Sequence, residues 1–406
     1  MDQNLRTDWN VTTMDQNLGT DWNVTTMDQN LGTDWNVTTV DQNLRTDWNV
    51  TTMDQNLKVI DWNFEEDFFA TLPWPPEYPI TLADQIRNVL KDIQMGYYPI
   101  LAIVGVPVNL VTVVILICKN CGLSKCVTHY LVAMALADLL VVILDLILRH
   151  IPIIFHEQFH FLKFIPVCNI HAVLLYAATD CSVWFTVTFT FDRFVAISCQ
   201  KLKSKYCSEK TASVVLGTVT VLSCLKNIFW YFMVSGQYKL INDPWFCNYI
   251  NAVLFSPVWG TIVFLHYILN PCVPFVLILL LNVLTTRHIL VMSRARRRLR
   301  VHSSEQSPRD PEMESRRKSI ILLFVISANF ILLWSTLMVT TLDFQIFWLT
   351  YQSANLDPFV EELGYMLQLL SCCTNTAIYA VTQTKFREHL KNVLKYPFTP
   401  ILQLIK

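Results

Sequence analysis

The sequence predicts an all-α membrane protein, a bundle of seven transmembrane helices. Of the 406 residues, 53% are hydrophobic and only 16% are charged, which is less charge than a soluble surface needs. The apolar residues gather in long blocks, and a block of about 18 or more can span the hydrocarbon core as a helix. Seven blocks in one chain argue against a large soluble core. We expect spans near 97–118, 127–148, 168–197, 212–234, 260–286, 318–342 and 359–382.

The distribution of basic residues predicts the orientation of these spans. Most of the 31 Lys and Arg residues lie in the first, third and fifth connections and in the C-terminal segment. Positively charged loops stay in the cytoplasm, so we expect a multi-pass plasma-membrane protein with an extracellular N-terminus. The first 57 residues contain no apolar run that could form a signal peptide, and we expect the first span to act as the signal anchor.

Residues 1–57 form a tandem repeat with a 13-residue unit. The unit is too short and too polar to bury a core, so we expect disorder outside the membrane. Each full copy contains an Asn-Val-Thr sequon, which on the outer face accepts an N-glycan. The alternative is a tandem duplication without a selected role. The predicted glycan acceptors are Asn10, Asn23, Asn36 and Asn49.

Three further segments follow the repeats. Residues 58–95 are rich in proline and acidic side chains and form an extracellular juxtamembrane segment. The bundle is expected over residues 96–383. Residues 384–406 place Leu390, Val393 and Leu394 at helical spacing among basic residues, which predicts an amphipathic helix on the inner surface and a cytoplasmic tail.

Several polar side chains fall inside the predicted spans, where ionisable groups are costly and indicate function, and five of them are informative here. Asp138 lies in the second span, and Asp192 and Arg193 lie at the inner end of the third. Asn109 in the first span and Asn375 in the seventh are neutral but need hydrogen-bond partners.

These residues resemble the motifs of rhodopsin-like (class A) G-protein-coupled receptors, in the right spans and order from Gly96 to Leu394. The triplet Asp192-Arg193-Phe194 departs from the family's Asp-Arg-Tyr at its last residue, and Thr376 replaces the proline of the seventh-helix motif. The other matching residues are Asn109 after Gly105, Asp138, Pro274, Phe330, Trp334, and Asn375 with Tyr379.

The sequence of the third helix, and the absence of the seventh-helix proline, resemble those of the orphan subgroup of probable G-protein coupled receptor 139 and its relative 142. This resemblance implies an aromatic ligand and a Gq-type heterotrimeric G protein. An amino-acid ligand would need a cation for its carboxylate, and no Lys or Arg occurs from Ser319 to Thr384. We therefore leave the ligand open as a small aromatic molecule or a peptide.

The family resemblance also implies roles for individual residues. Arg193 pairs with Asp192 at rest and is freed for the G protein when the sixth helix moves. In many relatives an acidic residue at the foot of the sixth helix is a second partner of the arginine. Here that foot reads Arg316-Arg317-Lys318, so this acidic partner is absent. In the fifth helix, Asn282 stands where a tyrosine is usual. The coupling switch is expected to comprise Asp192, Arg193, Phe194, Asn375 and Tyr379.

Two further sets complete the predicted site. A sodium ion would suit an all-oxygen cage around Asp138; the alternative is a hydrogen-bonded structural aspartate. The amine-binding aspartate of aminergic receptors is replaced by Leu175. The expected sodium ligands are Asp138, Ser182, Ser371 and Asn375. The expected pocket residues are Leu175, Tyr176, Asp180, Trp334, Thr341 and Tyr365.

Cysteine positions predict one disulfide. Of 12 cysteines, only Cys168 and Cys247 fall at the outer face, where an oxidising compartment favours a bridge, and the family has a bridge at these places. The segment from His156 to His160 fits the HExxH pattern of zinc proteases, but it lies in a short loop without a third ligand, so we expect no enzyme.

Three alternatives to a signalling receptor remain. A transporter predicts internal repeats among its spans and charged residues along a path, and neither is visible. A photoreceptor needs a lysine in the seventh span, which this chain lacks. A divergent, non-signalling seven-helix protein stays open because several motifs are altered.

Overall fold

The computed structural model describes residues 5–6, 14–15, 81–153, 161, 167–236, 247–250, 256–300, 311–350 and 356–395. The chain divides into two units, Met1–Pro79 and Ile80–Lys406. In the first, strand β1 (Leu5–Arg6) pairs antiparallel with β2 (Met14–Asp15). The predicted glycan acceptors, the remainder of the expected disorder over 1–57 and the HExxH segment lie outside the described residues.

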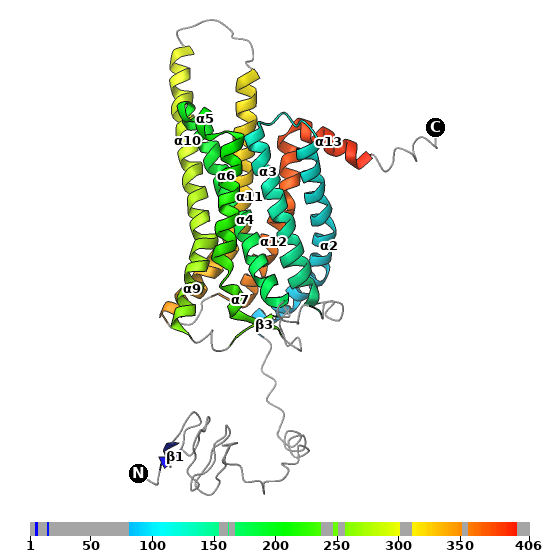
Figure 1. The fold of residues 1–406 in the computed structure, drawn as a ribbon, viewed down its shortest axis with the longest axis vertical. Helices are drawn as coiled ribbons and strands as arrows, with labels where there is room; N and C mark the ends of the chain where they lie inside the picture. The colour runs from blue at the N-terminus through cyan, green and yellow to red at the C-terminus, as the bar shows by residue number, and fades with distance from the viewer. Residues whose placement is uncertain are drawn as a thin grey trace, which may run out of the picture. The chain divides into compact units, whose positions relative to one another are not determined.

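The second unit is a bundle of long helices (Figure 1). The long elements are α2 (Leu82–Cys118), α3 (Lys125–Val141) with η1 (Val142–His150), α4 (Val167–Ser198), α6 (Glu209–Asn227), α9 (Pro257–Tyr267) with η4 (Ile268–Cys272) and α10 (Val273–Arg300), α11 (Pro311–Thr350) and α12 (Pro358–Thr382). The short ones are η2 (Ile151–Ile153), α5 (Gln200–Tyr206), α7 (Trp230–Met233) and α13 (Thr384–Lys395).

Six helical stretches of the described chain are long and apolar enough to cross a membrane. They correspond to the first six predicted spans. The seventh, α12, does not stand out by hydropathy because polar residues such as Gln368 and Asn375 lie along it. It nevertheless packs along α11 and α2, and Gln368 is buried. The predicted all-α membrane bundle is confirmed.

The first helix begins earlier than its apolar block. Thr81 caps α2: its hydroxyl accepts from the Asp84 backbone N–H, and the Asp84 carboxylate accepts from the Thr81 N–H. The extension is polar and therefore escapes a search for apolar runs. Arg87 and Gln94 of this extension reach Glu362 of α12, at 3.7 and 3.4 Å respectively.

A hairpin and a disulfide close the end of the bundle where α4 begins. Strand β3 (Val234–Gly236) pairs antiparallel with β4 (Cys247–Tyr249). Cys247 is joined to Cys168 near the start of α4, with 5.7 Å between the two Cα atoms. The expected disulfide is therefore present, and it ties the connection between α6 and α9 to α4.

The other end of the bundle has an apolar core beneath α13. Phe386 of α13 is fully buried, and its ring meets Tyr379 of α12 edge-on at 5.9 Å. Tyr130 and Phe189 form a second edge-on pair in the same cluster. This packing fixes α13 against the end of α12 and α2, close to Asp192 and Arg193 on α4.

Candidate functional site

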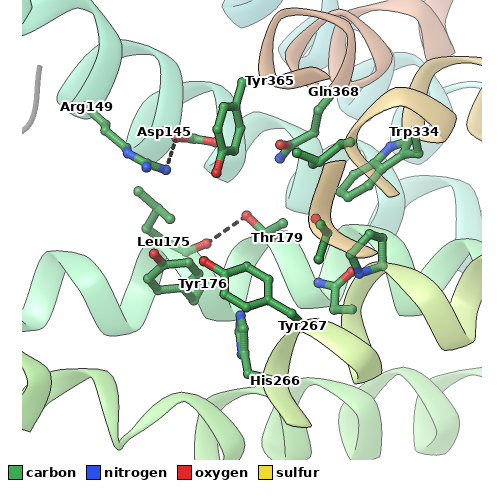
Figure 2. Close-up of a pocket in the computed structure, with 14 residues that line it drawn as sticks. Asp145, Arg149, Leu175, Tyr176, Thr179, His266, Tyr267, Trp334, Tyr365 and Gln368 are labelled. Carbon is green, nitrogen blue, oxygen red and sulfur yellow. Dashed lines mark hydrogen bonds and ion pairs between the residues drawn. The ribbon is translucent and has the colours of Figure 1, made fainter. Parts of the chain in front are cut away.

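A cavity lies in the half of the bundle nearer the disulfide, and about 530 Å³ of space inside it, counting its open mouth, is free of atoms (Figure 2). It places together five of the six expected pocket residues, from three helices. These are Leu175, Tyr176, Trp334, Thr341 and Tyr365. Aromatic and apolar walls with a few polar groups are typical of small-ligand sites.

One side of the cavity carries a cation that sequence reasoning did not assign to the pocket. Arg149 of η1 lines it, with its guanidinium 3.4 Å from the buried carboxylate of Asp145 and 5.5 Å from the ring centroid of Tyr365 (Figure 2). The sequence analysis looked for a cation only in the sixth and seventh spans, which contain no Lys or Arg. It therefore overlooked Arg149, which lies at the end of the second helix.

The opposite side of the cavity is aromatic. His266 of α9 packs edge-on against Tyr176 and Trp230, at 5.3 Å in each case, and Tyr267 follows it in the lining (Figure 2). Tyr176 in turn stacks on Trp230, with 4.0 Å between ring centroids. The cavity thus has one aromatic side and one side that carries the Arg149–Asp145 ion pair.

Asp180 does not lie in the lining, contrary to our expectation. It is buried one layer behind, where Lys226 of α6 is 2.7 Å from its Oδ2. Asn227 and Asn270 each donate a hydrogen bond of 2.6 Å to its carboxylate. The Lys226 ammonium also lies 3.3 Å from Nδ1 of His266, so the ion pair supports the pocket wall from behind.

Asp138 is a buried hydrogen-bonding hub between α3, α4 and α12. Ser182 donates to its Oδ1 and Asn375 to its Oδ2, both at 2.6 Å. Ser371, expected beside it, instead accepts from Asn329 of α11 at 3.4 Å. Asn109 donates to backbone carbonyls of Gly105 and Cys372, not to Asp138.

Asp192 and Arg193 pair at the far end of α4 from the pocket. Nε and Nη2 of Arg193 both donate to Oδ2 of Asp192, the former at 2.9 Å, and both residues are buried. The Cys126 thiol donates to the other carboxylate oxygen at 3.4 Å. Nη1 of Arg193 reaches Ser319 Oγ at 3.4 Å, so the foot of α11 offers a hydroxyl to Arg193.

The remaining switch residues lie on α4 and α12. Phe194 is half-buried, whereas Asn375 and Tyr379 are buried on α12. Among the residues that the structure describes, the buried Tyr379 hydroxyl and Asn282 Oδ1 have no hydrogen-bond partner, and the Asn282 amide donates to Ile278 O. Asn282, which stands where the family usually has a tyrosine, thus bonds to its own helix. The sequence analysis did not identify Ser319, which contacts Arg193, or Cys126, which contacts Asp192.

Comparison with known proteins identifies the family. The model of the 7 transmembrane receptor (rhodopsin family) matches residues 109–379, well over half of the chain. The chain belongs to the rhodopsin family of seven-transmembrane receptors. Its family resemblance is thereby confirmed, and the family consists of receptors rather than enzymes.

Individual relatives of this rhodopsin-family chain are distant. G-protein coupled receptor 39 of Mus musculus is 26% identical over 42% of the chain, and the match spans only 36% of that receptor's length; the Bos taurus protein gives the same figures. C5a anaphylatoxin chemotactic receptor 1 of Oncorhynchus mykiss is 26% identical over 74% of the chain and 81% of the relative.

The described part of the chain holds no group of three or more His, Cys, Asp or Glu side chains placed to bind a metal ion. Cys118, Cys121 and Cys126 are free thiols.

Proposed function

We propose that this chain is a G-protein-coupled receptor of the plasma membrane, with its N-terminus outside the cell. A ligand enters the cavity beside the disulfide, and a heterotrimeric G protein docks at the end that holds Arg193. One observation carries the proposal: a single helix, α4, contributes Tyr176 to the cavity wall and the buried Asp192–Arg193 pair at its other end. A ligand that favours one packing of the bundle would shift the state of that pair.

The coupling switch is tested with Arg193→Ala. We expect loss of G-protein coupling with near-normal surface expression, because the variant lacks the cation that the G protein would meet. Asp192→Asn should raise basal signalling, because a neutral amide holds the guanidinium less firmly. The measurement is nucleotide exchange on G protein in membranes that contain equal amounts of receptor. Unchanged coupling in Arg193→Ala would reject this mechanism and favour the divergent, non-signalling alternative.

We further propose a small aromatic ligand with a polar or anionic end. The aromatic wall around His266 supports the flat part, and Arg149 supports the anionic end. Membership of the orphan subgroup of probable G-protein coupled receptor 139 and its relative 142, and Gq coupling, belong to the same proposal and rest on the sequence motifs alone. A metabolite screen should yield an agonist whose potency falls in Arg149→Gln.

A peptide ligand is the second candidate. The relative that matches most of this chain bears the name of a receptor for C5a anaphylatoxin. In this second proposal the cavity holds one end of a peptide while the remainder stays outside. A peptide library in the same screen separates the two candidates.

Sodium binding at Asp138 is proposed as a modulator. The ligands would be Asp138, Ser182, Ser371 and Asn375, and the all-oxygen set supports a hard cation. Sodium would favour the resting packing, so raising sodium at constant ionic strength should lower agonist affinity in the wild type. Asp138→Asn should remove this dependence. The same sodium response in both proteins would leave Asp138 as a structural hub.

A further inference from the structure

The aromatic wall of the cavity contains an imidazole ring, and one of its nitrogens is held from behind. His266 of α9 lines the cavity, is 5% exposed, and points its ring towards Tyr176 (Figure 2). Nδ1 of this ring lies 3.3 Å from the ammonium of Lys226 on α6. Nε2 makes no hydrogen bond to any residue that the structure describes. The wall therefore presents a ring nitrogen that is left for another partner.

The charge of Lys226 decides which nitrogen of His266 carries the proton. The ammonium is 2.7 Å from Oδ2 of Asp180, which is 1% exposed, so Lys226 is the cation of an ion pair. Asn227 and Asn270 each donate to the same carboxylate at 2.6 Å, so Asp180 acts as an acceptor throughout. An ammonium group can only donate a hydrogen bond, and Nδ1 of His266 must therefore accept. The ring is then neutral, with its proton on Nε2.

We propose that Lys226 is a positioning residue that fixes His266 as a hydrogen-bond donor to the ligand of the cavity. The ligand is then a flat aromatic acid that carries a hydrogen-bond acceptor, such as a carbonyl oxygen, beside α9. The Nε2–H group donates to this oxygen, while Arg149 on the other side of the cavity binds the acid. This inference rests on the proposed function, because it concerns the same pocket, and it adds a second polar group to the ligand.

Selectivity follows from the cost of leaving a buried donor unpaired. A ligand with its own donor at this place would oppose Nε2–H, and a plain hydrocarbon would cover it without a partner, so both bind less well. A ring that changed its tautomer freely would accept either kind of group. The ion pair of Asp180 and Lys226 removes this freedom, because a proton on Nδ1 would point at an ammonium. The pair thus selects for ligands with an acceptor, although neither residue lines the cavity.

The first experiment observes the tautomer directly. The full chain is purified in detergent with ¹⁵N-labelled histidine, and the resonances of His266, one of nine histidines, are assigned by their loss in His266→Phe. Nitrogen chemical shifts distinguish a protonated from an unprotonated ring nitrogen. We expect the proton of His266 on Nε2 and none on Nδ1. A proton on Nδ1 in the wild type overturns the proposal.

Reversal of the ion pair tests the role of Lys226. The double variant Asp180→Lys, Lys226→Glu keeps two opposite charges behind the wall but faces Nδ1 with a carboxylate, which can only accept. We expect Nδ1 to become protonated. Lys210→Glu, at an exposed lysine of α6, is the matched control and should leave Nδ1 unprotonated.

A neutral double variant covers the case in which the reversed pair does not fold. In Asp180→Asn, Lys226→Met no charge is left behind the wall, and no side chain at position 226 donates to Nδ1. We expect part of the His266 rings to carry the proton on Nδ1. The wild-type tautomer alone, in whichever double variant folds, overturns the role of Lys226.

The donor role of His266 is tested with two probes of one shape. Para-acetylbenzoate has a carboxylate, a ring and a carbonyl oxygen, and para-isopropenylbenzoate replaces that oxygen with a methylene group. In ligand-observed NMR, the wild type should bind the ketone roughly threefold to tenfold more tightly, which is what one hydrogen bond contributes. His266→Phe keeps an aromatic ring and should bind both probes equally. Equal binding of the probes to the wild type, or no binding of either, overturns the donor role.

These measurements do not depend on signalling. If the wild type prefers the ketone but drives no nucleotide exchange on a G protein, the proposed function fails and the role of His266 stands. If exchange occurs and the two probes bind equally, the receptor function stands and the donor role of His266 is wrong.

Discussion

At the scale of single residues, the buried Asp180 carboxylate forms an ion pair with the partly exposed Lys226. Each charge leaves water to enter the interior, and their attraction offsets this only when hydrogen bonds satisfy the remaining atoms. Asn227 and Asn270 supply those hydrogen bonds to Asp180, and His266 lies beside the ammonium. The cluster joins α4, α6 and η4 directly behind the pocket wall.

Removing one partner of this pair should destabilise the protein. Lys226→Met leaves the Asp180 carboxylate buried without its cation, at a cost of about 3–5 kcal/mol, so we expect a clearly lower midpoint of thermal inactivation. Adding Asp180→Asn should recover much of the loss. Lys210→Met, at an exposed lysine of α6, is the matched control. If Lys226→Met were as stable as Lys210→Met, the pair would be incidental.

At the scale of elements, glycines set how closely neighbouring helices approach. A Cβ at Gly364 of α12 would lie 3.1 Å from backbone atoms of Leu337 on α11. Backbone cannot rotate away as a side chain can. A Cβ at Gly217 of α6, by contrast, would meet nothing within 4 Å. The close approach of α12 to Leu337, a pocket-lining residue of α11, therefore requires a residue without a Cβ at position 364.

Two alanine substitutions test this spacing. Gly364→Ala should force the helices apart and destabilise by about 1–3 kcal/mol, as overpacking does. Gly217→Ala should be neutral or stabilise by roughly 0.5–1 kcal/mol, because alanine favours helix. Thermal inactivation of the two purified variants gives the comparison. Similar midpoints would show that α11 and α12 adjust to a methyl group without loss.

At the scale of the whole molecule, the orientation in the membrane decides every functional claim. The basic loops predict an extracellular N-terminus, and Asn10, Asn23, Asn36 and Asn49 would then be exposed to glycosylation enzymes. Treatment of membranes with an N-glycosidase should lower the apparent mass. A variant with all four asparagines changed to glutamine should run at the lower mass from the start. An unchanged mass in glycosylation-competent cells would contradict this topology.

The sequence alone determined the class of the protein. Apolar blocks predicted seven spans, and six of them stand out in the described structure as long apolar helices. The polar residues Asp138, Arg193 and Asn375 marked buried positions, and their order in the chain matched the family. These properties can be recognised from the sequence because the bilayer requires long apolar helices and makes each buried charge rare.

Only the tertiary structure decided which side chains meet. Arg149 lies in η1 and Asn270 in η4, both π-helical segments, where a turn holds more residues than in an α-helix. A period of 3.6 residues therefore predicts the wrong face beyond such a segment, and Arg149 faces the pocket beside Tyr365. The sequence did not show that Asp180 on α4 pairs with Lys226 on α6, so Asp180 was assigned to the pocket. Such contacts depend on the rotation and register of the helices, and hydropathy determines neither.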